Sequence, residues 1–111
     1  MVVTRNQERK KKRLKIRFGV DSPKRVAFTG DLSIVGLHII TGQPEIPGTK
    51  LIVEINLPDE QPVRVHGRVQ WAKKVPPNLI RLVSEAGMGV RFIRFETGQQ
   101  ALEDYLETLR R

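Results

Sequence analysis

The sequence contains no cysteine and no long hydrophobic run, and each absence excludes a class of protein. Without thiols, the chain forms no disulfide framework, no thiolate zinc site and no cysteine nucleophile. The longest stretch free of aspartate, glutamate, lysine and arginine runs from Leu32 to Pro44, which is too short to span a bilayer. The cationic N-terminal residues are not followed by an apolar run, so we expect no secretory signal. These absences predict a cytoplasmic protein without a transmembrane segment.

The sequence also has little of what enzymes and metal sites require. Its two histidines, His38 and His66, are far apart and have no cluster of carboxylates beside them, so we predict no metal site. No glycine-rich phosphate loop is present. Asp31 and Ser33 lie close to His38 in the sequence, but a catalytic triad is assembled by the fold, and proximity along the chain is no evidence for one. We therefore predict no catalytic residue and no enzymatic activity.

Positive charge is concentrated at the N-terminus of a chain long enough for one domain. The net charge of the 111 residues is +8, and residues 1–25 account for all of it, with ten basic side chains and two acidic ones. Residues 26–111 carry equal numbers of basic and acidic groups. A cationic arm on a neutral body is suited to binding an anion, although such an arm can also serve only to keep a protein in solution.

Alternation of apolar and polar residues predicts short β-strands through most of the chain. The alternating runs lie at residues 14–20, 26–31, 37–40, 51–57, 63–71 and 88–92. Residues 79–83 form either a further short strand or a connector. Because no helical pattern separates these runs, a parallel α/β sheet is disfavoured. We predict an all-β domain, either an antiparallel barrel or a sandwich.

The last segment, residues 97–111, has helical periodicity instead. Thr97, followed three residues later by Gln100, predicts a capping box at the start of the helix. An isolated helix this short is marginal in water, so we expect it to dock on the strands or on a partner. The apolar stripe that would dock consists of Ala101, Leu102, Tyr105, Leu106 and Leu109.

Two short polar elements carry the clearest functional signal. The first is an R-x-x-x-R pattern, formed by Arg9 and Arg13 directly before the first predicted strand. The pattern occurs four times in the chain and is weak alone. The second is the D-x-S-x-x-G pattern of Asp31, Ser33 and Gly36, which occurs once. In this order, and ahead of the glycine-containing strand patterns that begin at positions 67 and 87, the two elements resemble the PilZ domain family, which binds the bacterial second messenger cyclic di-GMP.

The resemblance implies a fold and a division of the chain. Members of the family have a six-stranded antiparallel β-barrel, often followed by a helix, which agrees with the strands and the terminal helix predicted above. We therefore expect a flexible basic arm over residues 1–13, a PilZ-like barrel over residues 14–96 and a helix over residues 97–111 that docks on the barrel.

The resemblance also implies that Arg9, Arg13, Asp31, Ser33 and Gly36 bind the ligand. Arginine can donate to guanine O6 and N7 together and can stack on a base. Aspartate suits the donors N1 and N2 on the other guanine edge, and a serine hydroxyl can bond to a phosphate or a base. Glycine permits a positive φ or a close approach of the ligand to the backbone. The structural alternative is that the second element is a simple turn without a ligand.

The leading hypothesis is a receptor for cyclic di-GMP that needs no other cofactor. The free arm is expected to be disordered because its charges repel, and the ligand then orders it and changes the surface offered to an unidentified partner protein. By resemblance, the process controlled is motility, adhesion or exopolysaccharide output. Glu8 stands where family members that hold two stacked ligand molecules often have another arginine. We therefore expect one ligand molecule per chain.

Two other functions are compatible with the sequence. A small barrel with a basic arm can bind RNA or DNA. Single-strand binders usually expose several aromatic rings, however, and four of the six rings here are in phase with core positions, so we expect no nucleic-acid partner. These rings are Phe18, Phe28, Trp71 and Phe92. Alternatively, the chain has lost ligand binding and docks on a partner through its terminal helix.

Overall fold

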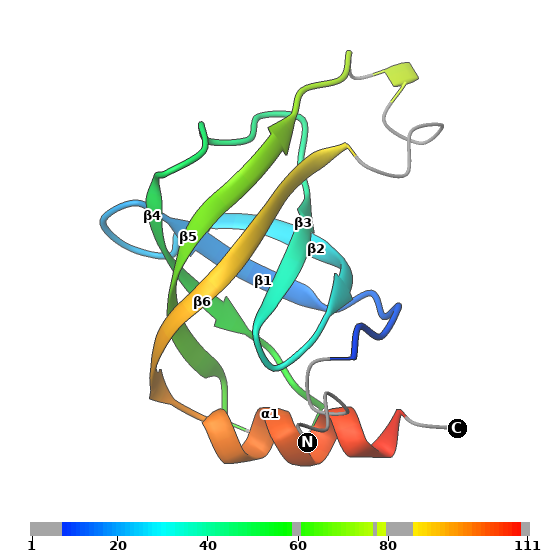
Figure 1. The fold of residues 1–111 in the computed structure, drawn as a ribbon, viewed down its shortest axis with the longest axis vertical. Coiled ribbons are helices and arrows are strands. Elements are labelled where there is room, and N and C mark those ends of the chain that lie inside the picture. The colour runs from blue at the N-terminus through cyan, green and yellow to red at the C-terminus, as the bar shows by residue number, and fades with distance from the viewer. Residues whose placement is uncertain (1–7, 59–60, 77, 80–85, 110–111) are drawn as a thin grey trace, which may run out of the picture.

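Six antiparallel strands and one helix make up the computed structural model, which describes residues 8–58, 61–76, 78–79 and 86–109. The strands close into a barrel in the order β1-β2-β3-β6-β5-β4, and α1 lies across one end of it (Figure 1). The bounds are β1 Lys15–Gly19, β2 Arg25–Leu32, β3 Gly36–Ile40, β4 Lys50–Ile55, β5 Val63–Lys73, β6 Gly87–Thr97 and α1 Gln99–Thr108. This architecture confirms the predicted six-stranded antiparallel barrel with a C-terminal helix.

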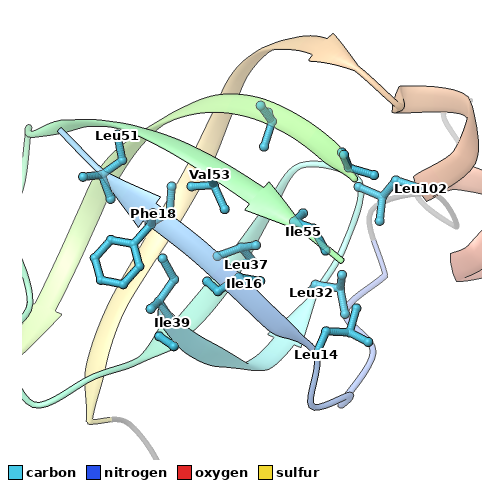
Figure 2. Close-up of a cluster of buried hydrophobic side chains, with 14 of the residues drawn as sticks. Leu14, Ile16, Phe18, Leu32, Leu37, Ile39, Leu51, Val53, Ile55 and Leu102 are labelled. Atoms are coloured by element: carbon cyan, nitrogen blue, oxygen red, sulfur yellow. The ribbon is translucent and has the colours of Figure 1, made fainter. Parts of the chain in front are cut away.

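The period-two pattern of the strands fills the barrel with apolar side chains. In β1, Ile16 and Phe18 are almost fully buried, whereas Lys15 and Arg17 face solvent. Figure 2 shows side chains of this kind from β1, β3 and β4 meeting in the barrel interior. Burial of one such side chain contributes about 1.5–3 kcal/mol, so this interior is the main source of stability of the fold.

In the second strand, the residues that face the core are not the ones that the alternation of apolar residues suggests. Ala27 and Thr29 are buried, whereas Val26 is exposed and Phe28 lies on the outer face. The Phe28 ring is covered there by the guanidinium of Arg13, while the buried Thr29 hydroxyl has hydrogen-bond partners in the segment that precedes β1. The prediction that Phe28 is in phase with the core is therefore wrong.

α1 closes one end of the barrel with its apolar face. Leu102 and Leu106 are buried against the core, and Figure 2 shows Leu102 beside the strand residues that fill the barrel. The predicted cap at Thr97 is wrong, because Thr97 is the last residue of β6 and the N-cap is Gly98, which has a φ of 87°. A Cβ at Gly98 would strain this left-handed backbone and lie 2.9 Å from Val63, so glycine is what lets the chain turn from β6 into α1.

Two further expectations concern the ends of these elements. The side chain of Gln100 donates to Asp104 at 3.0 Å, so it does not close a capping box.

Most of the strand or connector predicted at residues 79–83 lies outside the described residues, as do residues 1–7 of the arm. Within the described part of the chain, no helix has the length and apolarity that a membrane crossing needs.

Candidate ligand-binding site

The described part of the arm runs along the end of β2. Backbone hydrogen bonds join Lys10 and Leu32 in both directions, at 2.9 and 3.0 Å. Further along, the buried hydroxyl of Thr29 donates to the carbonyl oxygen of Lys12 and accepts from the N–H of Leu14. These contacts hold the segment against the barrel in this structure. The disorder expected of the free arm stays a prediction.

Arg9 and Asp31, both predicted to contact the ligand, lie side by side. Nη1 of Arg9 donates to Oδ1 of Asp31 at 2.9 Å. The two side chains are 51% and 28% exposed, so the pair is partly hydrated. An ion pair in such a position contributes about 0–1 kcal/mol. A charged ligand can therefore displace either partner at small energetic cost.

Arg9 also lines a shallow hollow of about 130 Å³ in the outer wall of the barrel. Gly89 belongs to its wall, and a Cβ there would lie 2.1 Å from Nε1 of Trp71, so the missing side chain lets the indole lie directly against the strand. The hollow is smaller than typical closed ligand pockets, so a nucleotide would lie across this surface rather than inside it. The complete lining is Arg9, Val35, Gln70, Trp71, Gly89, Val90 and Arg91.

Ser33 and Gly36 shape the tight turn between β2 and β3. The Ser33 hydroxyl is fully buried, accepts from the N–H of Val35 at 3.1 Å and donates to the carbonyl of Gly36 at 3.4 Å. Gly36 does not have a positive φ, but a Cβ there would lie 2.4 Å from the carbonyl oxygen of Val90. Both residues thus have the structural role of a turn that brings β3 close to β6. Their direct contact with a ligand stays a prediction.

Arg13 makes a contact different from that of the Arg9–Asp31 pair. Its guanidinium sits over the ring of Phe28, 4.3 Å from the ring centroid. Arg13 is not part of the lining of the hollow. A contact with a ligand in the hollow therefore requires this guanidinium to leave Phe28, or the ligand to extend over the arm.

Trp71 and Arg91 are candidate ligand-binding residues that sequence reasoning missed. Trp71 is in phase with the core by simple alternation, yet it is 41% exposed. The register of β5 against β6 shifts between Val69 and Trp71, and such bulges commonly re-aim side chains beside functional sites. The prediction that Trp71 belongs with the core is therefore wrong. Alternation continues through Trp71 in the sequence, so it carried no signal of this bulge.

The two histidines have structural contacts of different kinds. His38 lies on β3 with its ring centroid 5.3 Å from that of Trp71, and its Nε2 donates to the carbonyl oxygen of Ala86 at 2.8 Å. His38 therefore contacts both the indole of Trp71 and Ala86, the residue that precedes β6. His66 lies on β5 and pairs with Glu96 of β6. Among the described residues there is no group of three side chains that could hold a metal ion.

The chain shares its fold with a solved structure and its sequence pattern with a known domain family. No curated protein sequence matches the chain. The solved structure of the Bacillus subtilis inhibitor of motility, MotI/DgrA, is similar over 93% of this chain, with a TM-score of 0.71 and 19% sequence identity. The match covers 50% of that chain. The sequence profile of the PilZ domain matches residues 4–108. This chain therefore belongs to the PilZ domain family, whose members are generally receptors for cyclic di-GMP.

Proposed function

We propose that this protein is a cytoplasmic receptor for cyclic di-GMP without catalytic activity. The observation that carries the proposal is that Arg9, which lines the hollow together with Trp71 and Arg91, is paired with Asp31, 22 positions away in the sequence. These side chains supply a fork of donors, a carboxylate acceptor, an aromatic face and positive charge. A guanine nucleotide can use all four. Membership of the PilZ family supports the same ligand.

In the proposed complex, the ligand replaces the ion pair within the site. Asp31 accepts hydrogen bonds from N1 and N2 of a guanine, while Arg9 turns its donors to O6 and N7 or to a phosphate. Trp71 offers its indole face to a base. Arg13 leaves Phe28, which costs about 0.5–1 kcal/mol, and contacts the second half of the ligand. Ser33 and Gly36 hold the turn that borders the site.

The arm is the part that responds to the ligand in this proposal. Without ligand, the contacts made through Lys10 and Thr29 hold its described part to the barrel. A ligand that bridges Arg9 and Arg13 to the barrel adds two anchors and orders the arm more fully. The ordered arm then changes the surface offered to a partner protein. Membership of the family suggests motility, adhesion or exopolysaccharide output as the process controlled.

Isothermal titration calorimetry with cyclic di-GMP tests the proposal. The wild-type protein should bind the ligand saturably, with one molecule per chain. Arg9→Ala, Arg13→Ala and Asp31→Ala each remove a charge-assisted hydrogen bond, and each should weaken binding by about tenfold or more. Lys11→Ala is the matched control, because it removes an exposed cation from the same arm and should have a much smaller effect. Absence of binding to the wild-type protein at high ligand concentration would overturn the proposal.

Salt and competitor nucleotides separate this function from binding of RNA or DNA, which the N-terminal charge also favours. Binding to a phosphate backbone weakens steeply as salt rises, whereas guanine recognition weakens less. We expect GTP and cyclic di-AMP not to displace cyclic di-GMP. Tight binding of a uridine oligonucleotide at low salt, together with no affinity for cyclic di-GMP, would support the nucleic-acid function instead.

A further inference from the structure

Three basic side chains form a row across the outer face of neighbouring strands. Lys50 of β4 is the direct cross-strand partner of Arg68 of β5, and Arg68 is the direct partner of Arg91 of β6. All three residues are exposed. Like charges directly opposite one another destabilise a sheet. We refer to Lys50, Arg68 and Arg91 as the basic row.

The same outer face is arranged differently closer to α1. There, Arg64 pairs with Glu54 at 2.8 Å and with Glu96 at 3.3 Å. His66 pairs with Glu96 as well. No ion pair of the basic row occurs within the part of the chain that the structure describes. Among the described residues, acids are thus supplied to one half of this face and none to the row, which leaves the row open to negative charge from another molecule.

Apolar side chains lie beside the row and indicate the kind of molecule. Ile93, two residues after Arg91, is 51% exposed. Ile52, two residues after Lys50, is half-buried on the outer face of β4. The phosphate backbone of a nucleic acid gains nothing from isoleucine, whereas a protein segment with acidic and apolar side chains complements both kinds of group.

We propose that the basic row binds an acidic, partly apolar segment of another protein. Arg91 also lines the hollow assigned above to cyclic di-GMP, so the two sites share one cation. A dinucleotide in the hollow brings two negative charges beside the row and weakens the protein contact. This linkage rests on the proposed function, whereas the docking surface does not.

Fluorescence anisotropy with synthetic probes tests the docking surface. The probe is a labelled, glutamate-rich peptide of about twelve residues that includes two leucines, a size that fits one exposed strand face. Lys50→Gln/Arg68→Gln should lower the affinity for this peptide by about tenfold or more. The control Lys11→Gln/Lys24→Gln removes the same charge from the arm and from the β1–β2 turn, and its effect should be less than about twofold. A control peptide with glutamine in place of glutamate should bind neither the wild-type protein nor the variants.

The thermal unfolding midpoint of the same variants separates binding from folding. Because the row is repulsive, the midpoint of Lys50→Gln/Arg68→Gln should stay unchanged or rise. A marked fall would show that these cations stabilise the fold, and the argument from repulsion would be lost. Equal loss of peptide affinity in the double variant and its control would also overturn the proposal. The proposal would also be overturned if a uridine oligonucleotide of equal length bound more tightly than the acidic peptide.

Repeating the peptide titration with saturating cyclic di-GMP tests the linkage. The peptide should bind several-fold more weakly, and it should lower the affinity for cyclic di-GMP by the same factor. Lys50→Gln/Arg68→Gln lies outside the hollow and should still bind cyclic di-GMP. If the chain binds no cyclic di-GMP, the proposed function fails while the peptide titration still decides on the surface. If cyclic di-GMP binds but leaves the affinity for the peptide unchanged, the linkage is wrong while the docking surface stands.

Discussion

The hydroxyl of Thr29 donates a hydrogen bond to the carbonyl oxygen of Lys12 at 2.5 Å and accepts one from the N–H of Leu14 at 2.9 Å. It therefore holds the backbone on both sides of Arg13. Thr29→Val keeps the shape of the side chain but removes both bonds, so the free energy of unfolding should fall by about 1–3 kcal/mol. Urea denaturation measures this, and faster amide exchange at Leu14 reports release of the arm.

Thr29→Ser is the matched control for that loss, because it keeps the hydroxyl and removes only a methyl group. The serine variant should retain slow exchange at Leu14 and most of the stability. If the valine and serine variants are equally destabilised, the methyl group and not the hydroxyl is what matters at this position.

Gly36→Ala should destabilise the barrel even without a ligand. The added Cβ would lie 2.4 Å from the carbonyl oxygen of Val90, which belongs to the neighbouring strand and cannot move alone. Overpacking of this kind costs about 1–3 kcal/mol in the free energy of unfolding. Chemical denaturation measures the loss. A variant with wild-type stability that no longer binds cyclic di-GMP would instead show that Gly36 serves the ligand and not the strand contact.

Leu102→Ala should detach or loosen α1. Leu102 is fully buried against the core, and truncation of such a leucine lowers the free energy of unfolding by about 2–5 kcal/mol. Gln100→Ala, on the exposed side of the same helix, should change it by less than about 0.5 kcal/mol. Wild-type stability of Leu102→Ala, measured by thermal or chemical unfolding, would contradict the helix packing described above.

Glu96 should make stability depend on pH in the acid range. The hydrogen bond from His66, together with the nearby charge of Arg64, lowers the pKa of Glu96 below its ordinary value of 4.5. A carboxyl with a lowered pKa in the folded state stabilises the protein above its unfolded pKa, and this contribution is lost as the pH falls through the folded value. Glu96→Gln should therefore be less stable than the wild-type protein at neutral pH. The difference should shrink below about pH 4.

Urea denaturation at several pH values measures this effect. Glu103→Gln is the charge-matched control on α1, since Glu103 forms no ion pair with any described residue. A stability difference for Glu96→Gln that is independent of pH would show that the carboxylate charge is not the cause.

The fold was largely predictable because burial follows alternation along most strands. Ile16 and Phe18 are inside as their spacing predicts, and Leu102 is buried on the apolar stripe of the helix. The prediction failed for Phe28, whose ring is covered on the outside by Arg13. It failed for Trp71 because a bulge shifts the strand register, and alternation carries no information about bulges.

The candidate site was predictable only in part. The two motifs named Arg9 and Asp31, which the fold does bring together. They did not name Trp71 or Arg91, because these residues lie on two later strands whose neighbours depend on barrel closure. A motif lists residues that are close in sequence, whereas a site collects side chains that are close in space.

By itself, the sequence determined the strand count, the terminal helix, the cationic arm and the family, because periodicity, charge and short motifs are local properties of the chain. The tertiary structure alone decided which strands are neighbours. Closure of the barrel placed Arg91 in both the hollow and the basic row, and it set Lys50 and Arg68 in line with Arg91. Cross-strand register depends on packing between distant segments, and so the surfaces that a ligand or a partner meets emerge only from the fold.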